Sequence, residues 1–247
     1  MNDYKNVLVV GANSDIAKEC SLIWAKRGCN FVLASRDLNK MSELKQKLEV
    51  NNAPAVYLYE IDVINYETHG KLIEFCEKNL GKIDLVLIAH GVLFNSEEMK
   101  NTTNLKKLIE INGVSTVLLI RALFNHMKNN VSGGICVISS IAGDRSRPSN
   151  FEYGMTKQMV SFYLEGLRQE AHECNISLTL IKPGLVATSM TSHMPKTKLF
   201  SSPVAVGYSI VRAVDRHKFS VYTPRYWKLI AVILRSLPFK FLARSNI

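Results

Sequence analysis

The sequence has few of the residues that build metal centres or disulfide frameworks. Its five cysteines are widely spaced, and no two of them form a C-x-x-C pair. An odd number without paired spacing predicts reduced thiols, no disulfide and no metal site, as is usual for a protein of the cytoplasm.

Long uninterrupted apolar runs are also missing, and no secretory leader is expected. No uninterrupted apolar stretch reaches the roughly 18 residues that a membrane-spanning helix needs, and residues 1–11 run directly into a strand pattern. The 247 residues, 47% of them apolar, are enough for one large domain with a buried core. We expect that domain over 1–224, followed by a basic, apolar tail over 225–247.

Acidic residues are absent from the end of the chain. From Arg216 onward there are seven Lys or Arg residues and no Asp or Glu, within a chain of formal net charge +10. Such a segment suits an anionic surface. It contains no known nucleic-acid-binding module, so nucleic acid is not an expected partner.

Apolar runs alternate with amphipathic stretches along most of the chain. Continuous Val, Ile and Leu runs predict buried strands at 5–10, 30–34, 55–60, 84–89, 133–139, 176–181 and 219–222. Helical periodicity lies near 15–27, 38–50, 66–79, 104–129, 153–174 and 203–217. This alternation predicts an α/β fold of the Rossmann type: a doubly wound parallel sheet of about seven strands with helices on both faces. Ligands of such sheets bind beyond the carboxyl ends of the strands.

A candidate phosphate-binding turn follows the first strand in "VLVVGANSDIAKEC". Gly11 stands where a tight turn is needed, Asn13 and Ser14 can form hydrogen bonds, and Asp15 is placed to cap the next helix. The free N–H groups at the start of that helix suit a pyrophosphate. An ordinary strand–turn–helix is the alternative.

The end of the second strand bears on which dinucleotide binds. It reads Ser35–Arg36, where an acidic residue would hold a ribose 2′-hydroxyl. A guanidinium matches a phosphate instead, so the sequence favours NADP(H) over NAD(H). Alternatively Arg36 lies free in solvent, partly neutralised by Asp37.

"YGMTK" places Tyr153 and Lys157 four residues apart on one helix face. An ammonium near a phenol favours the phenolate, which predicts a lowered tyrosine pKa and proton transfer near neutral pH. Ser140, at the end of the fifth predicted strand, could hold the same substrate oxygen.

"GANSDIA", "IDV" at 61–63, Asn112, "ISSIAG" at 138–143, "YGMTK" and "KPGLVAT" at 182–188 occur in this order. Together they resemble the short-chain dehydrogenase/reductase family over roughly 5–220. The resemblance implies NADPH-dependent carbonyl reduction, with Asn112 holding a relay water, Ser140 positioning the carbonyl, Tyr153 as acid or base and Lys157 on the nicotinamide ribose. It implies cofactor contacts from Gly11, Asn13, Ser14, Asp15, Ile16, Ser35, Arg36, Asp62, Val63, Ala89, His90, Gly91, Tyr153, Lys157, Pro183, Gly184, Val186 and Thr188.

Two departures from the family pattern affect these contacts. Asp15 and Ala17 replace the second and third loop glycines, and the family's Asn-Asn-Ala-Gly reads Ile88-Ala89-His90-Gly91. Of that motif only Gly91 is retained. His90 either meets the cofactor ribose or supports the edge of the sheet, and we favour the structural role.

Substrate choice must come from two loops. Residues 141–151 carry Arg145 and Arg147, which are either a site for a phosphorylated substrate or solvated loop charge. Residues 189–202 are expected to form a flexible lid. They include Met190, His193, Met194, Lys196 and Lys198. The segment "RYWKLIAVILRSLPFKFLARSNI" predicts a helix that ends at Pro238. This helix could equally lie on a membrane surface, form a dimer interface or cap the substrate.

"RSRPSNFEYGMTK" and the basic, apolar C-terminus are similar to the reductases of polyprenylphosphoryl 2-keto-pentoses in cell-envelope sugar synthesis. This resemblance implies a ketoreductase of a lipid-linked sugar, in the cytoplasm or peripherally on the membrane, with an upstream partner oxidase. The wider resemblance to the short-chain family implies a homodimer or homotetramer formed through 104–129 and 153–174. The alternatives are a reductase of a steroid-like, acyl or xenobiotic carbonyl, and a catalytically silent NADP(H)-sensing protein.

Overall fold

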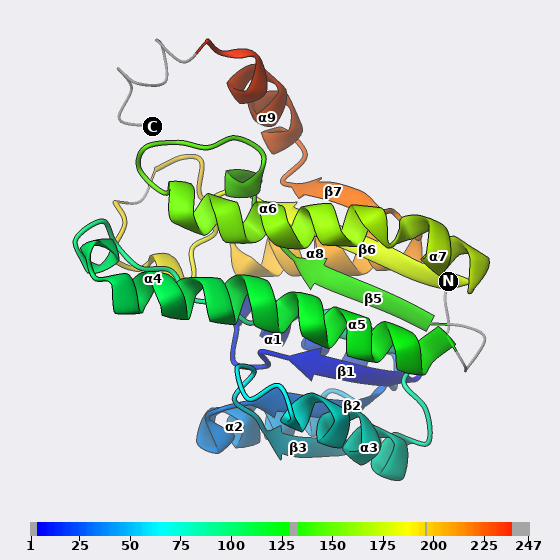
Figure 1. Cartoon of the computed structure of the whole chain (residues 1–247). Coiled ribbons are helices and arrows are strands. Elements are labelled where there is room, and N and C mark those ends of the chain that lie inside the picture. The colour runs from blue at the N-terminus through cyan, green and yellow to red at the C-terminus, as the bar shows by residue number, and fades with distance from the viewer. Residues whose placement is uncertain (1–3, 129–132, 196, 239–247) are drawn as a thin grey trace.

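The computed structural model describes residues 4–128, 133–195 and 197–238. A single sheet of seven parallel strands, in the order β3-β2-β1-β4-β5-β6-β7, forms the centre of the molecule (Figure 1). Its strands are β1 (Asn6–Val10), β2 (Asn30–Ser35), β3 (Val56–Glu60), β4 (Leu85–Ile88), β5 (Gly133–Ile138), β6 (Ile176–Pro183) and β7 (Ser220–Thr223). The predicted Rossmann-type fold is confirmed, and each strand ends within two residues of the sequence-based prediction.

Helices cover both faces of this sheet. They are α1 (Asp15–Ala25), α2 (Leu38–Val50), α3 (Thr68–Leu80), α4 (Thr102–Leu108), α5 (Ser115–Met127), α6 (Phe151–Gly166), α7 (Arg168–Glu173), α8 (Pro203–Asp215) and α9 (Trp227–Ser236). In Figure 1, α5 and α6 lie in front of the sheet, and α1 and α8 lie behind it. The chain crosses between faces after β3, and the return to β4 beside β1 creates the switch in strand order.

The apolar strands supply two separate cores because successive side chains point to opposite faces. In β1, Val7 and Val9 belong to the core shared with α1, α2 and α8, whereas Leu8 and Val10 belong to the core under α3, α5 and α6. All four side chains are fully buried. A strand buried on both faces must be apolar throughout, which is why these runs were readable in the sequence.

The helix predicted over 104–129 is interrupted in its middle. Residues Ile109–Val114 form a π-helical segment, labelled η2 in the structure, between α4 and α5. Hydrophobic periodicity cannot reveal such a segment because it adds a single residue to an otherwise regular helix. Residue 129 of the predicted helix lies outside the described residues.

Among the described residues, one helix has the length and mean hydropathy of a membrane span, although charged residues interrupt its apolar sequence. It runs from Thr102 to Met127, with half of its most apolar window buried inside the molecule. Its buried side chains, among them Leu119, Leu123 and Phe124, pack in the core beneath α3 and α6. This packing accounts for its apolar character.

The cysteines form no disulfide. Cys20, Cys29, Cys76 and Cys136 are buried free thiols, and Cys174 is partly exposed. Burial raises the pKa of Cys76 to about 12, so this thiol stays protonated and inert at neutral pH.

Candidate active site

A cleft of about 940 Å³ opens at the carboxyl edge of the sheet, where the topology predicts a ligand site. Its volume lies in the range of small-molecule and cofactor sites. The cleft is lined by every residue predicted to contact cofactor and by three of the four predicted catalytic residues. Asn112 is the exception.

The turn after β1 approaches the neighbouring strand closely. Gly11 has φ of +80°, and a Cβ there would lie 2.4 Å from the backbone nitrogen of His90. Only glycine combines this backbone conformation with that contact. A single glycine therefore preserves the turn although Asp15 and Ala17 occupy the later glycine positions of the motif.

Asn13 joins this turn to the end of β2. Its side-chain amide donates to the Ser35 hydroxyl at 3.0 Å and to the Asp37 carbonyl at 3.1 Å. Its Oδ1 atom is buried in the cleft wall and has no partner within the described part of the chain. A buried acceptor without a donor is costly, so the residues present fit a ligand that supplies an N–H or O–H group here.

The predicted helix cap is displaced by one residue. Ser14 holds the N-cap position of α1, and Asp15 is the first helical residue. The Asp15 carboxylate instead accepts a hydrogen bond from the backbone amide of Ser189 at 2.8 Å. It thus ties the phosphate-binding turn to the loop over the substrate side of the cleft.

Arg36 is exposed at the rim of the cleft and forms no ion pair in the described ranges. Asp37 does not neutralise it, because the Asp37 carboxylate caps α2 at the Lys40 amide and pairs with the Lys40 ammonium at 3.5 Å. The Lys40 amide holds the pKa of Asp37 below its usual value. A free guanidinium at this end of the cleft fits a phosphate.

His90 makes contacts that fit the structural role. Its Nε2 lies 3.1 Å from the Ser115 hydroxyl and 3.0 Å from the Thr116 hydroxyl at the start of α5. Burial, and then the charge of Lys157, lower the pKa of His90 to about 3, so the ring is neutral. The ring lines the cleft while joining the end of β4 to the helix behind it.

Asn112 lies fully buried in the π-helical segment. Its Oδ1 accepts from the Val92 amide at 2.8 Å, and its Nδ2 donates to the Val92 carbonyl at 2.8 Å. A Cβ on Gly91 would lie 3.1 Å from Asn112 Oδ1 and 3.6 Å from Lys157 Nζ. The amide therefore braces the loop after β4 beside the lysine, and the relay water remains a prediction.

Ser140, Tyr153 and Lys157 come together from two elements, the end of β5 and the first turns of α6. Ser140 lies near Tyr153, and hydrogen bonding from its side chain acts to lower the pKa of the tyrosine. Lys157 Nζ lies 5.6 Å from the centroid of the Tyr153 ring and donates to the Ile138 carbonyl at 3.2 Å. The approach of α6 depends on Gly154, where a Cβ would lie 2.6 Å from the Ala142 carbonyl.

The predicted direction of the tyrosine pKa is wrong. Burial raises the pKa of Tyr153 to about 12, although the hydrogen bond with Ser140 acts in the opposite direction. Burial also lowers the pKa of Lys157 to about 8. Both groups lie in a cleft wall that disfavours charge, so the phenol is protonated at neutral pH and can give a proton.

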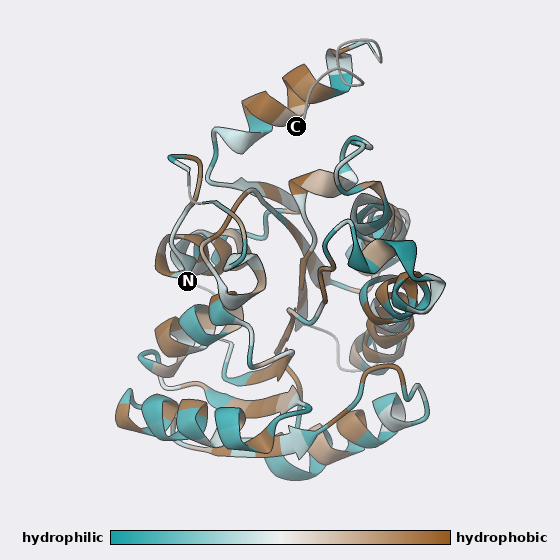
Figure 2. Ribbon diagram, turned by 90° about the vertical axis from the view of Figure 1, so that its left-hand side faces the viewer, coloured by the Kyte–Doolittle hydropathy of each residue, from teal (hydrophilic) through white to brown (hydrophobic). Residues whose placement is uncertain are grey.

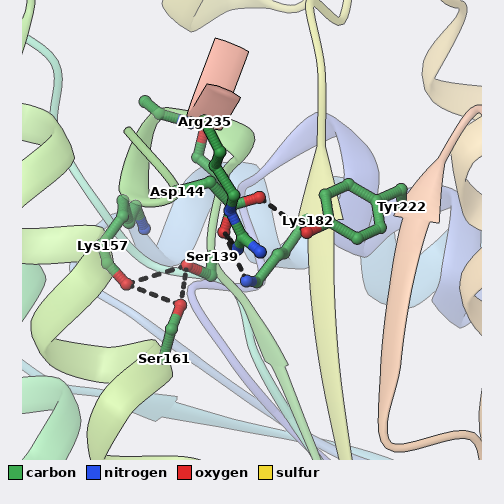
Figure 3. A network of polar contacts seen from close by, with 9 residues as sticks. Ser139, Asp144, Lys157, Ser161, Lys182, Tyr222 and Arg235 are labelled. Atoms are coloured by element: carbon green, nitrogen blue, oxygen red, sulfur yellow. Dashed lines mark hydrogen bonds and ion pairs between the residues drawn. The ribbon is translucent and has the colours of Figure 1, made fainter. Parts of the chain in front are cut away.

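A second hydroxyl at the end of β5 fixes the helix that carries these groups. Ser139 donates to the Lys157 carbonyl at 3.0 Å and lies 2.9 Å from the Ser161 hydroxyl (Figure 3). Ser161 itself donates to the same carbonyl at 2.8 Å. Sequence reasoning assigned a role only to Ser140, and the neighbouring serine in "ISSIAG" is the signal that could have indicated this contact.

The substrate side of the cleft is formed by loops and by α9. The segment after β6 contributes Pro183, Gly184, Val186 and Thr188, and Thr188 caps a short 3-10 turn, Ser189–Thr191. Met190, His193, Met194 and Leu199 add further lining, and Trp227, Ile230 and Leu234 of α9 form an apolar wall. A Cβ on Gly184 would lie 1.9 Å from Trp227, so this glycine admits the indole. Lys196 lies outside the described residues.

Arg147 and Arg145 differ in position. Arg147 lines the cleft, and burial lowers its pKa; it makes no ion pair within the residues that the structure describes. Arg145 is turned toward α9 and donates to the Leu237 carbonyl at 3.4 Å. Of the two arginines, only Arg147 is available to a bound anion.

The fold and the position of the cleft define a doubly wound α/β protein of the Rossmann type. Residues 5–199 match the short chain dehydrogenase family. The chain belongs to this family and is an oxidoreductase of the class that interconverts alcohols and carbonyls.

Relatives span nearly the whole chain. An uncharacterized oxidoreductase of Mycobacterium tuberculosis is 28% identical over 233 residues, which cover 94% of this chain and 93% of the relative. Dehydrogenase/reductase SDR family member 7B of Bos taurus is 25% identical over 249 residues, covering 94% and 77%.

Solved structures share the fold. A short-chain dehydrogenase from Sphingobium yanoikuyae in complex with NADPH superposes with a TM-score of 0.80 at 20% identity, covering 95% of this chain and 96% of the other. An alcohol dehydrogenase from Thermococcus sibiricus complexed with 5-hydroxy-NADP gives 0.77 at 17% identity, covering 88% and 95%.

Proposed function

We propose that the protein is an NADPH-dependent ketone reductase of a cell-envelope sugar that is linked to a polyprenyl phosphate. The observation that carries the chemistry is the Ser140–Tyr153–Lys157 group in the wall of the cleft. The cofactor preference rests on the unpaired Arg36 and on the NADP-type ligands named for similar structures.

The residues act on the carbonyl oxygen. A bound reduced nicotinamide supplies a hydride for the carbonyl carbon. The Ser140 hydroxyl positions the oxygen, and Tyr153 gives its proton to the developing alkoxide. A tyrosine held protonated suits reduction better than oxidation, and the Lys157 ammonium stabilises the phenolate that remains.

Lys157 would hold the nicotinamide ribose as well as act on Tyr153. Its Nζ lies beside Gly91 and the Asn112 amide, in the wall of the cleft. Asn13, the start of α1 and Arg36 would hold the phosphates. Asp62, at the rim of the cleft, is assigned to the adenine end.

The substrate assignment rests on two features of the other half of the cleft. Arg147 is a partly buried cation that forms no ion pair in the described ranges, and it would bind a phosphate of the substrate. The apolar wall of Trp227, Ile230 and Leu234 would receive the first isoprene units of a lipid chain. Such a ketone must be formed by an upstream oxidation of the corresponding alcohol, which requires a partner oxidase.

The test is NADPH oxidation with a panel of carbonyl substrates, comparing wild type with Tyr153→Phe. We expect turnover with a phosphate-linked keto sugar, a loss of at least about a thousandfold in kcat in the variant, and unchanged NADPH binding by fluorescence titration. Turnover only with steroid-like or acyl ketones would reassign the substrate. Cofactor binding without any turnover would favour a sensor.

We also propose a homodimer through α5 and α6. Met155, Met159 and Phe162 lie on one face of α6, and Leu118 lies on α5 in the same layer of helices. Their exposed fractions are 49, 40, 74 and 42%. Four exposed apolar side chains on adjacent helices suit a second copy of the chain. Light scattering of wild type and Phe162→Ser decides: a wild-type mass of 27.8 kDa would reject the dimer.

A further inference from the structure

Helix α9 stands apart from the layers of the α/β body (Figure 1). Its buried side chains, Trp227 and Ala231, join Ile141 in a small apolar cluster separate from the two cores of the sheet. The inner face of the helix is therefore committed to the wall of the cleft.

A buried carboxylate fixes the rotation of α9. Asp144 Oδ1 lies 2.8 Å from Arg235 of α9 and 2.5 Å from Lys182 at the end of β6. Its Oδ2 accepts from the Tyr222 hydroxyl of β7 at 2.7 Å. The Asp144 side chain is 2% exposed, and Figure 3 shows the three partners converging on it. Because Arg235 is held there, the opposite side of the helix must point outward.

That outward side is apolar. Leu229, Val232 and Ile233 are 66, 53 and 52% exposed. Tyr226 extends the surface toward the loop after β6, where its hydroxyl donates to the carbonyl of the exposed Leu199 at 3.2 Å. We call these five side chains the outer face. Figure 2 shows α9 at the margin of the molecule, with brown apolar stretches between polar ones.

The charge around the outer face is positive. Arg225 and Lys228 are exposed beside it, and neither forms an ion pair in the portion of the chain described by the structure. Every charged side chain from Arg216 to the end of the chain is basic. A second copy of the same helix would bring like charges together, whereas anionic phospholipid would neutralise them.

We propose that the outer face of α9 docks on an anionic phospholipid bilayer. Apolar side chains enter the boundary between headgroups and acyl chains, and the flanking cations meet lipid phosphates. Because the inner face of the same helix lines the cleft, docking places the mouth of the active site at the membrane surface.

The test is co-sedimentation of the full chain with sucrose-loaded vesicles, either phosphatidylcholine alone or with 30% phosphatidylglycerol added as the probe (roughly the anionic content that makes charge decisive). We expect at least about tenfold tighter binding to the anionic vesicles, weakened by salt. Leu229→Ser with Ile233→Ser should reduce binding about tenfold or more, since both apolar groups are lost. Val50→Ser, which removes an exposed apolar side chain on α2, away from α9 and from the proposed dimer interface, should leave binding unchanged.

No substrate enters this assay, so its result is independent of the reductase proposal. Circular dichroism and NADPH titration show whether the double variant is folded. The proposal is overturned if wild type ignores anionic vesicles, or if folded double variant binds as wild type does. A fall in oligomeric mass with the double variant and no vesicle binding by wild type would assign the outer face to a second copy instead.

Discussion

The Ser139 hydroxyl donates a hydrogen bond to the main-chain carbonyl of Lys157, so the end of β5 holds the helix turn that carries the lysine. The adjacent residue, Ser140, contacts Tyr153. Two consecutive serines therefore set the distance between strand and helix on which the catalytic geometry depends.

Replacing Ser139 by alanine should lower kcat several-fold and the free energy of unfolding by about 1 kcal/mol, because one buried hydrogen bond is lost. Ser161→Ala is the matched control. It removes a bond to the same carbonyl from within α6 but leaves the link to the strand. Steady-state kinetics and urea titration should show similar stability losses but a smaller kcat effect for Ser161→Ala. Equal kcat effects would mean that the strand link has no special role.

The pH dependence of reduction should follow Lys157. Its pKa of about 8 lies below the ordinary 10.5 because of burial, so the ammonium is lost as pH rises through 8. We expect kcat/KM to fall above this pH by up to about tenfold per unit. In stability the sign is opposite: burial of the ammonium opposes folding below pH 8 and is relieved between 8 and 10.5.

Lys157→Arg tests the origin of that alkaline limb. A guanidinium keeps its charge across the range, so the variant should be slower but free of the decline near pH 8. A pH–rate profile with the same limb in both proteins would assign the limb to another group.

Arg36→Gln should discriminate between the two nicotinamide cofactors. Loss of a charge-assisted contact to a phosphate costs roughly 1.5–3 kcal/mol, so KM for NADPH should rise roughly 10- to 100-fold while KM for NADH changes little. Lys45→Gln on α2 removes a neighbouring charge outside the cleft and serves as control. Equal effects of the two substitutions on NADPH would point to general attraction rather than a direct contact.

Asp144 and Arg235 should differ sharply although they form one ion pair. Asp144→Asn leaves Lys182, whose side chain is 9% exposed, without a carboxylate, and breaking such a pair costs about 3–5 kcal/mol. Arg235 is half exposed, so Arg235→Gln should cost less than about 1 kcal/mol. Urea denaturation gives both values, and hydrogen exchange should increase over 227–236 in both variants. Equal losses of stability in Asp144→Asn and Arg235→Gln would contradict a central role of the buried Asp144 carboxylate in this cluster.

The sheet and the residues of the cleft could be predicted from the sequence because strands buried on both faces leave continuous apolar runs, and functional groups follow the strand ends. The tyrosine pKa could not, because desolvation depends on packing rather than on spacing. The burial and pairing of Asp144 could not be predicted for a similar reason. Its partners Lys182 and Tyr222 are distant in the sequence, and nothing in "GDRSR" indicates a buried carboxylate. Only the structure shows that Asp37 pairs with Lys40 and leaves Arg36 without a carboxylate partner among the described residues.

The π-helical turn at Ile109–Val114 sets the orientation of Asn112 relative to α5. Removing one residue from this turn would restore ordinary helical hydrogen bonding, yet everything on its amino-terminal side would rotate by about 100° relative to α5. Asn112 would swing away from Val92, and the loop after β4 would lose its brace. The turn is thus a place where a one-residue change in length would leave the domain able to fold and unable to hold its reactive centre.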